Sequence, residues 1–301
     1  MIYGDFMTLE QLRIFVAVAD RQHVTRAAEA LNLTQSAVSS AVTALETRHG
    51  VKLFDRVGRN IVLNQAGETF LAEARAVLAR AAAAEAALAD LGDLARGRLS
   101  IHASQTIASY WLPIRLAAFN RAYPGVALDV AIGNTAQAAR AVTEGAAELG
   151  LVEGEVDEPA LSQSILDLDE LSLVVARTHP WAGGAAEPTD LKTSRWVVRE
   201  AGSGTRSSLE AALERRGLAL ADLDVAMVLP SNEAVRGAVE AGAGAALMSR
   251  RVAAPRLQIG TLIAAPFDIP PRAFHVLRHK ERYRSRAGDA FLEVVRSSTN
   301  S

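Results

Sequence analysis

The chain has 301 residues, 50% of them apolar, and a formal net charge of -2 at pH 7. The length suggests about two domains with a sizeable core. The charge excludes a chain that binds nucleic acid through overall basicity, so any such contact must rest on local placement. The lack of cysteine excludes disulfides, thiol-based redox sensing and cysteine metal sites.

No export signal is apparent, and the most apolar long stretch, 72–94, is interrupted by charged residues. Such a stretch cannot span a membrane. We therefore expect a cytoplasmic protein with no membrane partner. Residues 1–6 precede Met7 and a capping box that begins at Thr8, and we assign them no function.

Two short helices joined by a polar turn are predicted between Thr25 and Glu46. The first ends near residues 32–33, and Thr34 is placed to cap the second. In the second helix, apolar residues recur at i, i+3, i+4 and i+7, and hydroxyl residues share the opposite side. The apolar side consists of Val38, Ala41, Val42 and Leu45.

The hydroxyl side of this second helix predicts insertion into the major groove of double-stranded DNA. A helix in that groove needs small side chains and groups that both donate to and accept from base edges and phosphates. The alternative is a solvated face, but solvated faces favour Glu and Lys, which are depleted here. The predicted DNA contacts of this region are Thr34, Gln35, Ser36, Ser39, Ser40 and Thr43.

A small hairpin wing is predicted next, because a turn at Gly58 separates the apolar runs 51–54 and 61–63. Cations beside the turn would contact the phosphates that flank the groove and so fix the register of the protein on DNA. Two nearby carboxylates, Glu46 and Asp55, dilute this basic patch. The predicted cations are Lys52, Arg56 and Arg59.

Residues 9–67 closely resemble the winged helix-turn-helix of LysR-type transcriptional regulators. The motifs that carry the resemblance are 8–15 for the first helix, 26–28 and 33–39 for the helix-turn-helix, and 53–56 for the wing. Two positions depart from the family pattern, Ser40 and Asn64. The resemblance implies a homo-oligomer that binds double-stranded DNA, either a dimer or the tetramer expected of the family. RNA polymerase is a further candidate partner.

A long alanine-rich helix is predicted from about Gln65 to Leu94. Its apolar stripe has alternating three- and four-residue steps, which suits pairing with a second copy of the chain. Glu85 interrupts the stripe, and the alternative is a helix packed on its own domain. The stripe consists of Leu71, Ala74, Leu78, Ala81 and Leu88.

An α/β domain is predicted after a boundary at residues 92–97, because short apolar strands alternate with helical segments. These crossovers predict a parallel sheet. The expected strands are 98–103, 126–132, 149–152, 171–176, 195–198, 224–229, 245–248 and 274–278, and the expected helices are 111–123, 136–144, 207–216 and 233–241.

Small polar residues follow several of these strands. Ligands of open α/β sheets bind beyond the carboxyl ends of strands, where helix N-termini favour anions. The segment 202–206 resembles an anion cradle but lacks the Lys and the spacing of a nucleotide-binding P-loop, which argues against nucleotide hydrolysis. The predicted effector contacts are Ser104, Gln105, Thr106, Asn134, Glu153, Gly202, Ser203, Gly204, Thr205 and Asn232.

Residues from about 98 to 292 resemble the two-lobed, periplasmic-binding-protein-like effector domain of the same family. The motifs look most like the branch that contains YeiE, CysL and CbbR. This branch implies a small anionic effector, with sulfite or sulfate first and a phosphorylated metabolite second. Glu153 would repel an anion unless it pairs with Arg206 or is protonated, or it contacts a hydroxyl or amine of an organic effector.

The expected organisation is an α/β protein with a winged helix-turn-helix at 7–64, a linker and dimerisation helix at 65–96 and an effector-binding domain at 97–301. Lobe I is expected at about 97–168 and 268–301, and lobe II at about 169–267. We expect no enzyme, cofactor or metal, because Ser203 lacks a nucleophile elbow and the histidines are scattered. The alternative is a cytoplasmic solute-binding or sensing protein without sequence-specific DNA binding.

Overall fold

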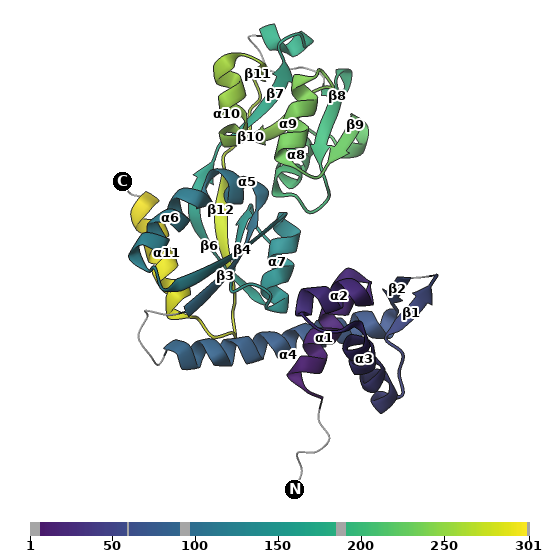
Figure 1. Cartoon of the computed structure of the whole chain (residues 1–301). Helices are drawn as coiled ribbons and strands as arrows, with labels where there is room; N and C mark the ends of the chain where they lie inside the picture. Colours follow the sequence, from purple (N-terminus) through teal and green to yellow (C-terminus); the bar gives the residue numbers. More distant parts are fainter. Residues whose placement is uncertain (1–6, 59, 91–96, 185–190, 300–301) are drawn as a thin grey trace. The chain divides into compact units, whose positions relative to one another are not determined.

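The computed structural model describes residues 7–58, 60–90, 97–184 and 191–299 (Figure 1). The chain separates into two compact units, the first formed mainly by residues up to Leu88 and the second by most of the rest. Each unit has its own apolar core. Within the described ranges, no helix combines the length and hydropathy that crossing a bilayer requires.

Unit 1 begins with the helices α1 (Leu9–Arg21), α2 (Val24–Leu31) and α3 (Gln35–His49). The predicted capping box is present, since Thr8 accepts a hydrogen bond from the third amide of α1. Asn32 ends α2 in the left-handed conformation, with φ 54°, which Asn tolerates better than most residues. The predicted helix-turn-helix is therefore confirmed.

The predicted wing is an antiparallel hairpin of β1 (Phe54–Val57) and β2 (Asn60–Leu63). Gly58 lies at its turn with φ +63°, a conformation that favours glycine. The long helix α4 (Gln65–Asp90) follows directly. The end of the predicted linker, 91–96, lies outside the described residues.

The core of unit 1 is centred on Phe15, whose ring lies 5.5 Å from that of Phe54 and 4.8 Å from that of Phe70. The first half of the predicted pairing stripe on α4 packs into this core, whereas Leu88 is 71% exposed. The stripe residues in this core are Leu71, Ala74 and Leu78. For this part of the stripe, the helix therefore packs on its own domain, which was the alternative prediction.

Unit 2 contains two lobes. The first lobe is built on a five-stranded sheet in the order β4-β3-β5-β12-β6. The first three of these strands are parallel, but β12 runs antiparallel to both neighbours, so the prediction of a purely parallel sheet is wrong. The return of the chain from the second lobe places β12 in this direction. The strands are β3 (Gly97–Ser104), β4 (Val126–Gly133), β5 (Leu149–Glu153), β6 (Leu161–Asp169) and β12 (Arg272–His279).

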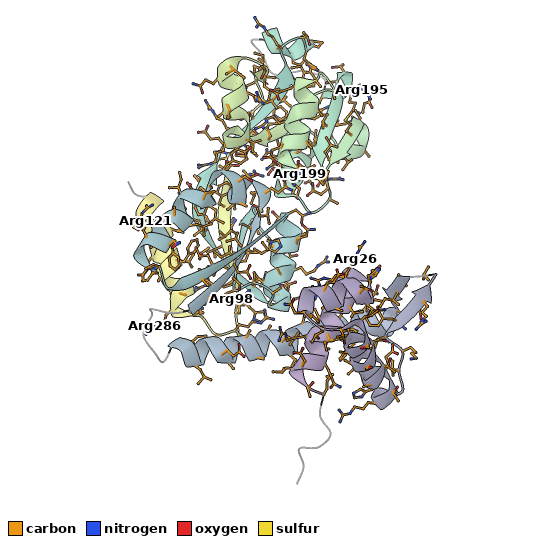
Figure 2. All side chains as sticks on the ribbon, viewed as in Figure 1. Arg26, Arg98, Arg121, Arg195, Arg199 and Arg286 are labelled. Atoms are coloured by element: carbon orange, nitrogen blue, oxygen red, sulfur yellow. The ribbon has the colours of Figure 1, made fainter. Side chains whose placement is uncertain are left out.

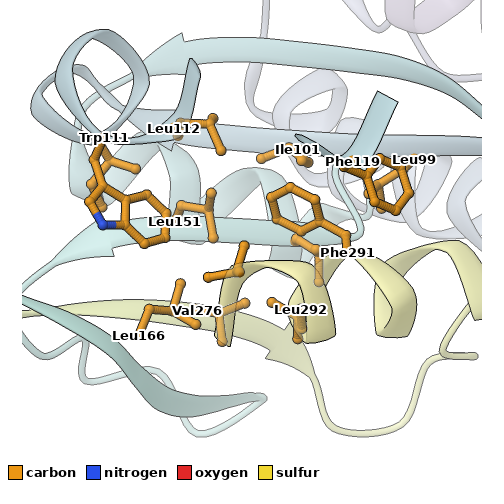
Figure 3. Packing of buried hydrophobic residues seen from close by; sticks show 14 of the residues in the cluster. Leu99, Ile101, Trp111, Leu112, Phe119, Leu151, Leu166, Val276, Phe291 and Leu292 are labelled. Carbon is orange, nitrogen blue, oxygen red and sulfur yellow. The ribbon is translucent and has the colours of Figure 1, made fainter. Parts of the chain in front are cut away.

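Helices cover both faces of this sheet (Figure 1). On one face, Trp111, Phe119 and Phe291 are fully buried beside the apolar residues of the central strands (Figure 3). The opposite face packs on the alanines of α7 around Val142. The helices of this lobe are α5 (Gln105–Tyr110), α6 (Leu112–Ala122), α7 (Thr135–Glu144) and α11 (Arg286–Thr299).

The second lobe holds two smaller sheets, the antiparallel β10-β7-β11 and the parallel pair β8-β9. Its core is centred on Trp196, and Leu213 and Leu247 pack around it. The elements are β7 (Leu171–Ala176), β8 (Arg195–Arg199), α8 (Gly204–Glu214), β9 (Asp224–Leu229), α9 (Asn232–Glu240), β10 (Ala246–Ser249), α10 (Arg250–Ile259) and β11 (Leu262–Ala265).

The chain passes between the lobes twice, once after Asp169 and once before Arg272. These two residues are register partners on the neighbouring strands β6 and β12. The two crossings are therefore side by side.

Candidate DNA interface and ligand site

The hydroxyl face of α3 is open in unit 1. Val38 and Leu45 point into the core and are almost completely buried, as the helical spacing predicts. Thr34 caps the helix by accepting a hydrogen bond of 3.2 Å from the Ala37 amide. All the predicted contacts of this region are exposed, namely Thr34, Gln35, Ser36, Ser39, Ser40 and Thr43.

The wing presents the exposed cation Arg56 on β1, and Arg59 lies outside the described residues. Lys52 is exposed but its ammonium lies 2.6 Å from Glu46 Oε2, so its charge is partly balanced. Glu46 is nearly buried, and its Oε1 also accepts a hydrogen bond of 2.9 Å from the Leu53 amide. Glu46 thus joins α3 to the start of the wing, a role that the sequence reasoning missed.

Burial alone would raise the pKa of Glu46, but the hydrogen bonds from Lys52 and Leu53 outweigh it and hold this pKa below its ordinary 4.5. The folded state therefore gains stability from ionised Glu46 above pH 4.5 and loses it as the pH falls through the lowered pKa.

Glu46→Gln should therefore lower the free energy of opening at the Leu53 amide by about 1 kcal/mol at neutral pH. In acid, this free energy should fall less in Glu46→Gln than in the wild type. Hydrogen exchange of the Leu53 amide, corrected for its intrinsic rate, measures this opening energy. Glu10→Gln is the matched control, because Glu10 forms an exposed ion pair with Arg13 on α1. An equal acid response in wild type and Glu46→Gln would contradict the role of Glu46.

The predicted effector residues lie at the carboxyl ends of β3, β4 and β5 and at the starts of α5, α7, α8 and α9. Residues 105–110, for which the sequence predicted no helix, form the short helix α5. Most of the set is buried: Ser104, Thr106, Asn134, Glu153, Ser203, Gly204, Thr205 and Asn232, whereas Gln105 is half-buried and Gly202 is exposed.

Amide side chains of the set connect the two lobes. Gln105 donates from Nε2 to the Pro230 carbonyl at 2.7 Å and accepts at Oε1 from the backbone amide of Asn232 at 3.1 Å. Asn134 donates from Nδ2 to Glu200 Oε1 at 3.2 Å and accepts from the Gln137 amide. These amides are therefore already engaged by protein partners.

Two hydroxyls of the set are not used as helix caps. Ser104 and Ser203 occupy the N-cap positions of α5 and α8 but make no side-chain cap hydrogen bond. By contrast, Ser231 and Ser249 cap α9 and α10 in the usual way. The Ser104 hydroxyl is also buried and has no hydrogen-bond partner among the described residues, which is costly unless a ligand satisfies it.

Two glycines allow the second lobe to approach this cluster closely. Gly202 has φ +83°, a left-handed conformation that disfavours other residues. A Cβ on Gly204 would lie 2.6 Å from the Glu153 carbonyl oxygen. The start of α8 can therefore pack on the end of β5 only with glycine at this position.

Of the alternatives considered for Glu153, the structure does not contain the pairing with Arg206. Arg206 pairs instead with Glu210 on its own helix, with Nε and Oε1 at 2.8 Å. The cation beside Glu153 is Arg272, whose Nη2 lies 3.7 Å from Glu153 Oε1. Both side chains are buried, so Glu153 is partly compensated from the crossing strand β12.

Two buried arginines next to the cluster were missed by the sequence reasoning. Arg272 donates from Nε to Asp169 Oδ2 at 3.0 Å and from Nη1 to Thr205 Oγ1 at 3.0 Å. Arg199, at the end of β8 (Figure 2), makes two hydrogen bonds to Glu200 at 2.8 and 2.9 Å. Burial would raise the pKa of Glu200, but Arg199 outweighs this and lowers it.

Across the described parts of the chain, no group of three or more His, Asp or Glu side chains is arranged to hold a metal ion. The predicted effector residues together with Arg199 and Arg272, here called the ligand cluster, instead offer hydroxyls, buried guanidinium groups and helix N-termini. Such groups bind acceptor-rich anions.

Two family models cover most of this chain. Residues 9–68 match the model described as bacterial regulatory helix-turn-helix protein, lysR family. Residues 92–300 match the model described as LysR substrate binding domain.

Curated relatives extend this similarity over nearly the full length. An uncharacterized HTH-type transcriptional regulator, YeiE of Escherichia coli K12, is 34% identical and covers 95% of this chain and 96% of its own. A probable RuBisCO transcriptional regulator of Nostoc is 33% identical and covers 96% of this chain and 87% of its own. These relatives agree with the branch that the motifs indicated.

Solved structures share the fold. Full-length CbnR in complex with its target DNA has a TM-score of 0.67 and 24% identity, and covers 97% of this chain and 100% of its own. The regulatory domain of CcmR from Synechocystis, in complex with 2-PG, has a TM-score of 0.63 and 25% identity, and covers 68% of this chain and 99% of its own.

Proposed function

Because the chain belongs to the LysR family of DNA-binding transcriptional regulators, we propose that α3 reads the major groove and that unit 2 senses a small anion. Family members and the relatives above are regulators, and not enzymes. The alternative of a solute-binding protein without sequence-specific DNA binding is wrong, because residues 9–68 match the family's helix-turn-helix.

The proposed DNA contacts are the exposed hydroxyl and amide groups of α3, with Lys52, Arg56 and Arg59 on the flanking phosphates. The exposed face of α3 supports this proposal, since short hydroxyl side chains allow close approach and contact both bases and phosphates. CbnR, which shares the fold, has been solved on its target DNA. A dimer through α4, assembling further to a tetramer, would supply two such helices for a two-part operator.

The proposed effector is a small oxyanion or a ligand that carries one, bound between the lobes. The observation that carries this proposal is the pair of N-cap serines, Ser104 and Ser203, whose hydroxyls are left free of their own helices. Sulfite or sulfate and a phosphorylated metabolite both fit these donors. The 2-PG bound by the CcmR domain favours the phosphorylated class.

Ligand binding would favour one arrangement of the lobes by its differential affinity, and so alter promoter contacts. A thermal-shift screen of sulfite, sulfate, phosphate and 2-PG tests the proposal, because a ligand that binds only the native state raises its melting temperature. No shift with any of these probes would overturn the anion assignment.

Replacing both Ser203 and Thr205 by Ala should weaken binding of the best probe by about tenfold or more, because two donors to an anion are lost. Isothermal titration calorimetry measures this change. Ser207→Ala on the same helix is the matched control, since the exposed Ser207 hydroxyl bonds only to the Ser203 carbonyl. Equal affinities in the double variant and the control would remove these residues from the site.

A further inference from the structure

Two threonines of the ligand cluster accept hydrogen bonds whose direction is fixed. Thr205 Oγ1 accepts from Arg272 Nη1 at 3.0 Å. Thr106 Oγ1 accepts from Asn232 Nδ2 at 3.1 Å. A guanidinium has no acceptor, so the first direction is certain.

The direction of the hydrogen bond between Asn232 and Thr106 is fixed by another arginine, Arg199. Asn232 Oδ1 accepts from Arg199 Nη1, and only the oxygen of the amide can do so. The amide nitrogen of Asn232 must therefore face Thr106. The two threonines share the same state: each uses its oxygen as an acceptor, and neither donates its proton to another described residue.

Each arginine is held by a buried or half-buried carboxylate. Asp169 is completely buried and lies 2.9 Å from Arg272 Nη2 as well as accepting from its Nε. Glu200 binds Arg199 through two hydrogen bonds. Such paired contacts fix the orientation of a guanidinium.

The two chains of contacts run in opposite directions between the lobes. In the first, Glu200, Arg199 and Asn232 of the second lobe orient Thr106 of the first lobe. In the second, Asp169 and Arg272, on the crossing strands of the first-lobe sheet, orient Thr205 of the second lobe. Each lobe therefore sets the hydroxyl of the other.

We propose that these contacts direct the protons of Thr106 and Thr205 to the ligand as hydrogen-bond donors, so that the site favours acceptor-rich ligands and is complete only when the lobes lie together. The inference rests on the anion-sensing role proposed above and names Asn232, Arg199 and Arg272 as positioning residues. An anion that accepts a hydrogen bond from both hydroxyls stabilises this lobe arrangement, because the hydroxyls are free to rotate when the lobes separate.

Asn232→Asp tests the first chain of contacts. A carboxylate at this position still accepts from Arg199 but cannot donate to Thr106, whose proton would turn toward the new oxygen and away from the ligand. Ser231→Asp is the matched control, because it adds the same charge one residue earlier. It also keeps the cap on the Ala234 amide, since Asp is a good N-cap.

Titration of the full-length protein with phosphate, sulfite and 2-PG should show that Asn232→Asp binds at least about tenfold more weakly than Ser231→Asp, including a complete loss. The melting temperature without ligand should stay within the range of the control. Equal affinities in the two variants would mean that charge alone acts, and would overturn this inference while leaving the anion site standing.

Val and Ser replacements test both hydroxyls. Thr106→Val and Thr205→Val should each lower the affinity by about tenfold, whereas Thr106→Ser and Thr205→Ser should retain it, because only the hydroxyl is at stake. Loss of affinity in the Ser variants as well would show a packing role and would contradict the proposal. Failure of the wild type to bind any probe would instead overturn the anion-sensing function itself.

Discussion

Replacing Ser39 by Asp should lower the affinity for specific DNA by at least about 100-fold, since a carboxylate would be pressed against phosphates and base acceptors. Ser39 is an exposed residue in the second turn of α3, almost three turns before the helix ends at His49. Fluorescence anisotropy with a DNA fragment selected by the wild-type protein from a random pool measures this loss.

Thr69→Asp provides the control for Ser39→Asp. Thr69 is exposed at the start of the second turn of α4, near the N-terminus, where an added carboxylate is tolerated by the helix. The control should keep its affinity within a few-fold, and circular dichroism should show the same helix content in both variants. Retained specific binding by Ser39→Asp would defeat the assignment of α3 as the reading helix.

Asp169→Ala should destabilise unit 2 by about 3–5 kcal/mol, because it leaves the buried Arg272 guanidinium without its carboxylate. It also removes the acceptor of the Ser249 hydroxyl, which donates to Asp169 Oδ1 at 2.7 Å. Denaturant unfolding followed by tryptophan fluorescence reports on this unit alone. All three tryptophans lie there: Trp111, Trp181 and Trp196.

Two further variants sharpen the test on Asp169. Asp129→Ala breaks an exposed ion pair with Arg98 in the same unit and should cost less than about 1 kcal/mol. Replacing Asp169 by Asn, Arg272 by Met and Glu153 by Gln together removes the three buried charges that face one another and should recover most of the stability, since none of them is left unpaired. A cost for Asp169→Ala no larger than that of Asp129→Ala would show that the pair carries little energy.

The DNA-binding unit was predictable because its signals are local. The cap at Thr34, the spacing of Val38 and Leu45 and the turn at Gly58 each lie within a few residues of what they control. The hydroxyl face of α3 consists of the positions that the apolar spacing leaves on the opposite side of the same helix. Glu46 was interpreted only as a diluting charge, since its amide partner at Leu53 is set by how the wing folds back on α3.

Most strands of unit 2 were predictable, whereas the edge strand β6 and the helices α5 and α11 were not identified. The strand β6 lies at the edge of the sheet and was missed, because apolar and polar residues alternate only over 166–169 and not over the rest of the strand. The short helix α5 holds too few residues to show helical spacing. The helix α11 does carry the spacing, with Ala287, Ala290, Phe291 and Val295 buried, and the sequence reasoning overlooked it.

The charges around the ligand cluster could not be predicted from spacing. Asp169 and Arg272 are 103 residues apart and meet only because the chain crosses between the lobes on neighbouring strands. Arg206 was the nearest cation along the chain to the predicted cradle, and its own helix neutralises it. Contacts of this kind follow from topology, which local patterns do not contain.

The hydrogen bonds that Glu46 accepts from Lys52 and Leu53 tie α3 to the start of the hairpin. With the proposed DNA contacts, this tie would make the distance between the groove bound by α3 and the backbone contacted by the hairpin nearly constant. A promoter whose groove width does not match this distance must deform to fit, and stiff or pliable base steps would be distinguished even where no side chain reaches them.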